Sequence, residues 1–106
     1  MLPFIQDKYN NASKGYMSPR AYGTHLYAFV SQDWVKIGRS KHISKRLAEV
    51  RSAMPFELEL LGSWQDCGNY ERKVHEGLIA FTRHGEWFRC SPDVALAAVQ
   101  NAITCA

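Results

Sequence analysis

The sequence has few cysteines and no long hydrophobic run, and each absence excludes a class of protein. Its three cysteines, Cys67, Cys90 and Cys105, are an odd number at wide spacing without a CxxC pair, so neither a disulfide framework nor a standard zinc knuckle is indicated. Nowhere do about 18 apolar residues follow one another, as a membrane-spanning helix requires. The first residues also lack the charged-then-apolar order of a signal peptide. We therefore expect a cytoplasmic protein with reduced thiols and no membrane partner.

The length and composition indicate one globular domain preceded by an arm. A chain of 106 residues can bury one modest core, and 46% hydrophobic residues without low-complexity runs are typical of a folded domain. In residues 1–22, by contrast, proline, glycine, asparagine and serine are mixed with scattered aromatic residues and show no helical or strand period. We expect an N-terminal arm over residues 1–22 and a folded domain over residues 23–106.

From residue 25 onwards the apolar pattern predicts short strands and helices in turn. Two β-prone runs over residues 26–30 and 34–38 predict a hairpin. Apolar residues from Ile43 to Met54 recur at helical spacing, and a second helical stripe runs from Tyr70 to Phe81, with the helix ending near residue 85. Further strands are expected over residues 58–64 and 85–90. The element order ββαβαβα, with a last helix at the C-terminus, indicates the α+β class.

The last helix has a strong start signal at Ser91-Pro92-Asp93. Serine caps a helix, proline suits its first position, and an acid suits its positive end, so a helix over residues 94–104 is predicted. Branched apolar residues and alanines make this helix apolar nearly all round. We therefore expect it either to be well buried or to form an oligomer contact.

Positive charge is concentrated in one segment of the chain. Residues 36–51 contain six basic residues and a single acid, Glu49, although the whole chain has a formal net charge of only +3. Such a segment suits the phosphates of a nucleic acid, although a solvated helix face has the same composition. Arg46 is placed on the shoulder of the apolar stripe, where packing can hold its guanidinium toward a phosphate. The six basic residues are Lys36, Arg39, Lys41, Lys45, Arg46 and Arg51.

Three other side chains are suited to hydrolysis. Glu71 begins the second predicted helix with His75 one turn later, and its carboxylate suits either Mg²⁺ or the positive end of the helix dipole. Tyr27 lies on the first strand, where a tyrosine is usually a core residue. Its phenol becomes a useful base only if a cation such as Lys36 or Arg46 stabilises the phenolate. The predicted hairpin brings Tyr27 and Lys36 onto adjacent strands.

Taken in order, these residues form a pattern that resembles the GIY-YIG nuclease superfamily, in its compact phage and bacterial branch with a Lys-Ile-Gly second motif. The order and spacing of short motifs make the resemblance, above all the eight-residue step from Gly38 to Arg46. The motifs are Leu26-Tyr27, Val35-Lys36-Ile37-Gly38, Lys45-Arg46-Leu47, Glu71-Arg72-Lys73-Val74-His75 and Gly85-Glu86-Trp87-Phe88.

The resemblance implies a small three-stranded antiparallel sheet flanked by helices, and a metal-dependent DNA endonuclease of a bacterial or phage-infected cell. By this resemblance Tyr27 is the general base, and Arg46 and Lys36 contact the phosphate. Glu71 is the sole carboxylate ligand of Mg²⁺ or Mn²⁺, and His75 orients Glu71 or a water. The outer basic residues Arg39, Lys41, Lys45 and Arg51 are expected to bind DNA.

Some positions depart from the family pattern, and other functions stay open. His25 stands where the first motif usually has glycine, and Lys36 replaces a tyrosine. We expect no separate DNA-reading domain, so specificity would come from the arm, from a homodimer through the C-terminal helix or from a protein partner. The alternative function is a catalytically silent domain that binds nucleic acid or a protein. A zinc module lacks closely paired ligands; its candidates are Cys67, His75, His84 and Cys90.

Overall fold

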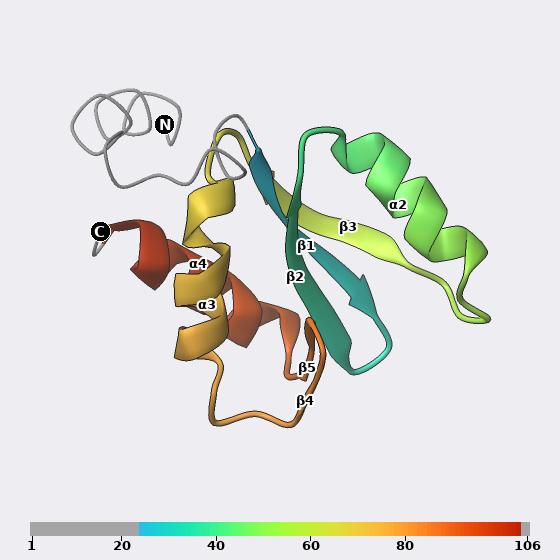
Figure 1. The fold of residues 1–106 in the computed structure, drawn as a ribbon. Coiled ribbons are helices and arrows are strands. Elements are labelled where there is room, and N and C mark those ends of the chain that lie inside the picture. Colours follow the sequence, from blue (N-terminus) through green and yellow to red (C-terminus); the bar gives the residue numbers. More distant parts are fainter. Residues whose placement is uncertain (1–23, 105–106) are drawn as a thin grey trace.

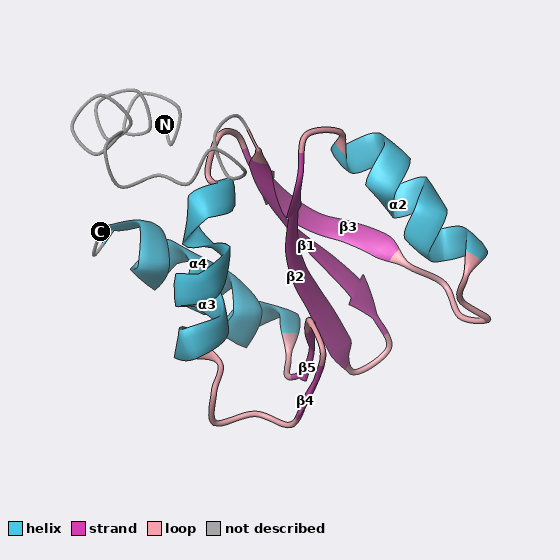
Figure 2. Ribbon diagram, viewed as in Figure 1, coloured by secondary structure: helices cyan, strands magenta, loops and turns pink. Residues whose placement is uncertain are grey.

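An antiparallel sheet forms the centre of the computed structural model, which describes residues 24–104 (Figures 1 and 2). The sheet has five strands in the order β3-β1-β2-β5-β4. Three α-helices pack on it, which confirms the α+β class. In chain order the elements are β1 (His25–Ser31), β2 (Trp34–Ser40), α2 (Ile43–Ser52), β3 (Glu59–Trp64), a short 3₁₀ turn η1 (Gly68–Tyr70), α3 (Glu71–Gly77), β4 (Arg83–His84), β5 (Trp87–Arg89) and α4 (Pro92–Thr104).

The β1–β2 hairpin confirms the first sequence prediction. Its connection is short because Gln32 adopts a left-handed conformation with φ of 54°. In the antiparallel register Tyr27 is opposite Gly38 and Phe29 is opposite Lys36. Side chains alternate between the two faces of a strand, so Tyr27, Phe29 and Lys36 lie on the same face.

Two core clusters lie on opposite faces of the sheet. One contains Leu26, Ala28, Ile37 and Phe88, and it is completed by residues of α3 and α4. The other is smaller and contains Tyr27, Phe29 and Leu58, against which the apolar stripe of α2 packs as the helical spacing predicted. Among the described residues, α2 is the only helix that packs on this second face (Figure 1).

The expectation of a three-stranded sheet is wrong, because β5 pairs with β2 and β4 pairs with β5. The predicted second helix does not reach residue 85: α3 ends at Gly77, and glycine is a common helix terminator. The chain then turns at Gly85, whose φ is +64°, and this turn joins β4 to β5. Two strands therefore form where the end of a helix and one returning strand were expected.

The expectation that the C-terminal helix is apolar nearly all round is also wrong. Ala95, Val99, Ala102 and Ile103 are buried, whereas Asp93, Ala97, Gln100, Asn101 and Thr104 are exposed. The helix is thus amphipathic, with one face packed in the core. Its other face carries the polar residues and alanine, whose small side chain adds little apolar surface. Its predicted start is confirmed, since the backbone N–H of Val94 donates to the Ser91 hydroxyl at 3.3 Å.

The predicted arm over residues 1–22 lies outside the described residues. Within residues 24–104, no helix combines the length and apolar character needed to cross a lipid bilayer.

Candidate active site

Gly38, the glycine of the Lys-Ile-Gly motif, leaves the space that the Tyr27 side chain occupies. A Cβ atom at position 38 would overlap the Tyr27 hydroxyl and would lie 3.0 Å from Oε1 of Glu86. The Tyr27 ring is fully buried and stacks on Phe29, with ring centroids 4.0 Å apart. The hydroxyl therefore lies over the backbone of β2 at Gly38, on the side where the carboxylate of Glu86, a residue of the β4–β5 turn, also lies.

Opposite charges gather around this hydroxyl from several elements. Nζ of Lys36, on β2, lies 3.2 Å from Oε1 of Glu86. Nε of Arg39, at the end of the same strand, lies 3.5 Å from Oε1 of Glu71, the first residue of α3. The carboxyl groups of Glu71 and Glu86 also interact, because Glu86 raises the pKa of Glu71. Two acids and two bases thus form one connected cluster beside Tyr27.

Burial and this cluster shift the pKa values of two of the predicted catalytic residues, Glu71 and Tyr27. Burial, followed by the hydrogen bond and negative charge of Glu86, raises the pKa of Glu71 to about 7, against the opposing effects of Arg39 and Lys36. Burial and the nearby Glu86 charge raise the pKa of Tyr27, and the Arg46 guanidinium acts in the opposite direction. The Tyr27 hydroxyl has no hydrogen-bond partner among the described residues. A fully buried hydroxyl without a partner lowers the stability of the fold.

His75 is fixed by contacts with both of its ring nitrogens. Its Nε2 is 2.9 Å from the carbonyl oxygen of Ile37, and its Nδ1 is 3.2 Å from Nη2 of Arg83. Because the carbonyl only accepts and the guanidinium only donates, the neutral tautomer with the proton on Nε2 satisfies both contacts. Burial lowers the pKa of His75, which favours the same neutral form. His75 lies 3.9 Å from Glu71 and holds β2 and β4 in place beside it.

Comparison with known protein families identifies the family of this chain. The T5orf172 domain matches residues 24–103, which is most of the chain. The chain belongs to the T5orf172 domain family. This phage-associated domain has a nuclease-like fold related to endonucleases of the GIY-YIG and HNH types. Comparisons with curated proteins and with solved structures gave no match. Family membership is compatible with a nuclease-like or DNA-binding role.

The T5orf172 domain places a residue in the site that sequence reasoning missed. Glu86 was noticed only as part of a motif, yet it contacts Lys36 and Glu71 and faces the Tyr27 hydroxyl. The signal available in the sequence was Gly85, a turn residue that exposes the following acid at a hairpin end. The strand pairing that carries this turn to β2 involves only short segments, so no local pattern indicated it.

The donor set of the T5orf172 domain fits a hard divalent cation. Within residues 24–104, no group of three or more histidine, cysteine or acidic residues is arranged around one point, which gives the zinc alternative no support. Glu71 and Glu86 do provide two adjacent carboxylates, and the Tyr27 hydroxyl lies beside them. Magnesium often takes only one or two carboxylates and keeps its other positions for water and phosphate oxygens. The chemistry of these donors therefore suits Mg²⁺ or Mn²⁺.

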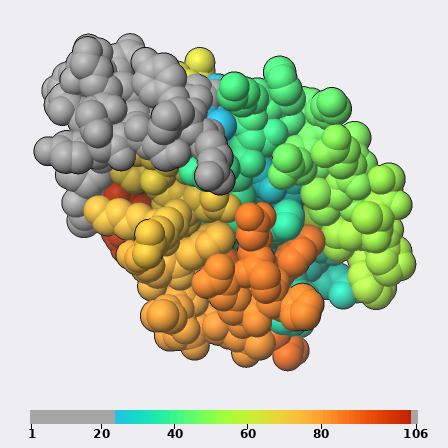
Figure 3. All heavy atoms as spheres, viewed as in Figure 1, coloured from blue at the N-terminus to red at the C-terminus, as the bar shows by residue number. Residues whose placement is uncertain are grey.

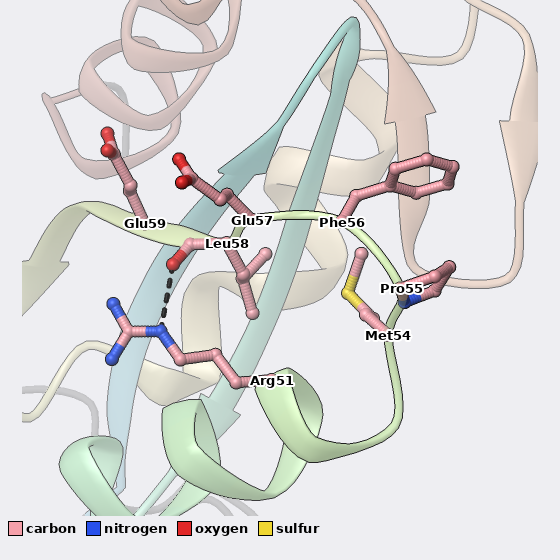
Figure 4. A pocket seen from close by; sticks show the side chains of 7 residues that line it. All are labelled: Arg51, Met54, Pro55, Phe56, Glu57, Leu58 and Glu59. Carbon is pink, nitrogen blue, oxygen red and sulfur yellow. Dashed lines mark hydrogen bonds between the residues drawn. The ribbon is translucent and has the colours of Figure 1, made fainter.

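The basic residues predicted to bind DNA divide into two groups. Arg46 is half-exposed on α2, near Tyr27 and 3.3 Å from Glu49, while Lys41 and Lys45 are exposed and form no ion pair within the described residues. Arg51 lies at the far end of α2, where its Nε donates to the carbonyl oxygen of Leu58 at 2.9 Å (Figure 4).

Figure 4 also shows the hollow beside Arg51, which has a volume of about 410 Å³. Its lining includes Phe56 and the acids Glu57 and Glu59 and none of the predicted catalytic residues. This hollow is therefore separate from the candidate active site. Arg51 fixes the connection between α2 and β3 there, and its terminal nitrogens extend to the surface.

Proposed function

We propose that this T5orf172 domain is a GIY-YIG-like DNA endonuclease that hydrolyses phosphodiester bonds with the help of Mg²⁺ or Mn²⁺. The observation that carries the proposal is the convergence of Tyr27 and Glu86 at Gly38, with Lys36 and Glu71 both interacting with Glu86. These side chains come from β1, β2, α3 and the β4–β5 turn. A general base, a phosphate-binding cation and a carboxylate pair are the groups that phosphodiester hydrolysis needs in one place.

In this proposal the carboxylates would hold the cation. Glu71 is the metal ligand, and Glu86 offers a second carboxylate beside it. Once bound, the metal would supply Lewis-acid stabilisation of the charge that develops on the phosphate and on the departing oxygen. Arg39 keeps the Glu71 carboxylate oriented toward the site through their 3.5 Å contact.

Tyr27 accepts the proton of the attacking water as a phenolate, after its own proton has passed to solvent. Its pKa is raised by burial and by the charge of Glu86 and Glu71, so the hydroxyl is neutral at pH 7 while these acids carry uncompensated charge. Neutralising the two carboxylates removes their part of this effect and leaves that of burial, against which the Arg46 guanidinium favours the phenolate. Lys36 and Arg46 then offset negative charge on the phosphate oxygens, and His75 holds the strands that carry them.

The test is cleavage of supercoiled plasmid by the full chain with Mg²⁺ or Mn²⁺. Wild-type protein should nick the plasmid and lose this activity in EDTA, and Glu71→Gln should lose at least about a hundredfold in rate. Glu76→Gln is the matched control, because Glu76 is exposed on the same helix and pairs only with Arg72 among the described residues. Cleavage by Glu71→Gln at the wild-type rate would contradict the proposal.

The alternative is a catalytically silent domain that binds nucleic acid. The raised pKa values of Tyr27 and Glu71 favour it, since neither group is ready for its catalytic role without a cation. Its signature is salt-dependent DNA binding that resembles wild type in Glu71→Gln, without cleavage in either metal. A plasmid-binding titration run beside the nicking assay separates the two functions.

A further inference from the structure

Two tryptophans lie next to the candidate active site on the open face of the sheet. In the β2–β5 register Lys36 is opposite Trp87, and Trp34 is opposite Arg89. Trp34 and Trp87 are therefore diagonal neighbours on one face, within reach of each other's rings. Both are half-buried, and this face belongs to the side of the sheet that α2 covers only in part.

Hollows adjoin the tryptophan pair on both sides. One, of about 180 Å³, is lined by Trp34, Trp87, Met54 and Phe56, and the Phe56 side chain is 53% exposed. The other, of about 300 Å³, is lined by the same two tryptophans together with residues 82–84. Figure 3 shows atoms of the β4–β5 region, in orange, beside those of the β1–β2 hairpin, in blue-green, and of α2, in green. The rings thus border open surface.

Basic side chains lie next to the two tryptophan rings. Nζ of Lys36 lies 5.5 Å from the centroid of the Trp87 ring, a cation–π distance, and Lys36 is also the cation that contacts Glu86 in the active site. Arg83 lines the larger hollow. Arg89 is exposed on β5, opposite Trp34, and its Nη2 lies 3.8 Å from Oδ2 of Asp33. Aromatic rings interleaved with basic side chains are the surface that binds single-stranded nucleic acid.

We propose that Trp34 and Trp87 form a stacking subsite for one or two unpaired DNA bases next to the phosphate held by Lys36. The proposal rests on the proposed function for the identity of its ligand as DNA. Because bases in a duplex are already stacked on their neighbours, the rings can be used only where the strand is single or locally opened. Lys36 links the two sites, since its ammonium group contacts both the Trp87 ring and the carboxylate cluster.

This subsite predicts a preference that the phosphate-binding residues alone cannot produce. Basic side chains bind any strand with the same phosphates, whereas stacking requires a base. The surface should therefore distinguish an oligonucleotide with bases from an abasic strand of equal length and charge. An aromatic surface can also bind a protein partner. In that case the affinity for DNA would not depend on the presence of bases.

The experiment measures binding of the full chain to labelled DNA by fluorescence anisotropy in EDTA, so that no cleavage occurs. The probes are a single-stranded thymidine 12-mer and an abasic 12-mer with the same number of phosphates. Trp34→Leu and Trp87→Leu should each weaken binding of the thymidine strand about tenfold and leave the abasic strand unchanged. Trp64→Leu is the matched control, because Trp64 lies on β3 and packs against the opposite core cluster. Circular dichroism checks that each variant is folded.

A conservative variant keeps the proposal testable if Trp87→Leu unfolds. Trp87→Phe retains a ring, so it should bind the thymidine strand within about threefold of wild type. Equal binding of the two probes by wild-type protein would overturn the subsite, as would wild-type affinity in both leucine variants. Plasmid cleavage is assayed separately in Mg²⁺: cleavage without base-dependent binding removes only the subsite, and base-dependent binding without cleavage removes only the nuclease.

Discussion

The carboxyl groups of Glu71 and Glu86 interact although Glu71 begins helix α3 and Glu86 lies in the turn between β4 and β5. Two carboxylates in such contact cannot both be ionised without repulsion, so one of them retains a proton near neutral pH. Together with burial, this contact raises the pKa of Glu71 to about 7. The protonation state of this pair therefore affects both the stability of the fold and the ability of Glu71 to bind a cation.

The first prediction concerns stability and pH. Because the pKa of Glu71 is raised from 4.5 to about 7 by folding, the folded chain binds this proton more tightly than the unfolded chain. The resulting stabilisation is complete below pH 4.5 and is lost as the pH rises through about 7. Glu71→Gln stays neutral throughout, so the melting temperature of wild type minus that of the variant should fall across this window. Thermal melts without metal measure it, and a constant difference would refute the shift.

The second prediction concerns metal binding. A carboxylate must lose its proton to ligate a cation, so affinity rises with pH through the ligand's pKa. With a Glu71 pKa of about 7, Mn²⁺ should bind about tenfold more tightly at pH 8 than at pH 6. Glu86→Gln removes the neighbouring negative charge and should move this dependence to lower pH. Electron paramagnetic resonance of free Mn²⁺ gives the affinities, with Glu76→Gln as the control that should match wild type.

The third prediction tests why the second motif needs glycine. In Gly38→Ala the new Cβ would overlap the Tyr27 hydroxyl, and the ring is held by its stack on Phe29. The hydroxyl must therefore move away from Glu86, at a cost of about 1–3 kcal/mol in stability and about a hundredfold or more in nicking rate. Gly77→Ala is the control, since its Cβ would meet only Cβ of Ala98 at 3.8 Å. Equal activity of both variants would show that the hydroxyl position is unimportant.

Local patterns in the sequence predicted those parts of the fold that depend on neighbours along the chain. The β1–β2 hairpin, the apolar face of α2 and the Ser91 cap all follow from residues a few positions apart. The strand predicted over residues 85–90 contains β5, but β4 was missed because Arg83–His84 is too short to show a period and becomes a strand only by pairing with β5. The amphipathic character of α4 was also missed, because its alanines were counted as apolar on every face.

The same distinction separates the predicted site residues from the missed one. Tyr27 and Lys36 could be placed together because a hairpin joins their strands. Glu86 reaches them only through the pairing of β5 with β2, which no spacing in the sequence reveals. Contacts of this kind also determine the pKa of Tyr27 and the fixed tautomer of His75. The chemistry of single residues was therefore predictable, whereas their mutual electrostatics required the fold.

The last prediction separates the chemical role of Tyr27 from its structural one. The ring fills the core beneath α2, whereas the hydroxyl is buried without a hydrogen-bond partner among the described residues. Tyr27→Phe keeps the ring and its stack on Phe29 and removes an unsatisfied polar atom, so its melting temperature should equal or exceed that of wild type.

If the hydroxyl is the general base, the same variant should lose about a hundredfold or more in plasmid nicking, as expected for removal of a group that transfers a proton. Its affinity for DNA should not change, because Lys36 and Arg46 are untouched. Nicking, anisotropy and thermal melting on one preparation give the three quantities together. Full activity in a stable Tyr27→Phe protein would mean that another group accepts the proton, and Glu86 is then the residue to examine, because it is the carboxylate that the Tyr27 hydroxyl faces across Gly38.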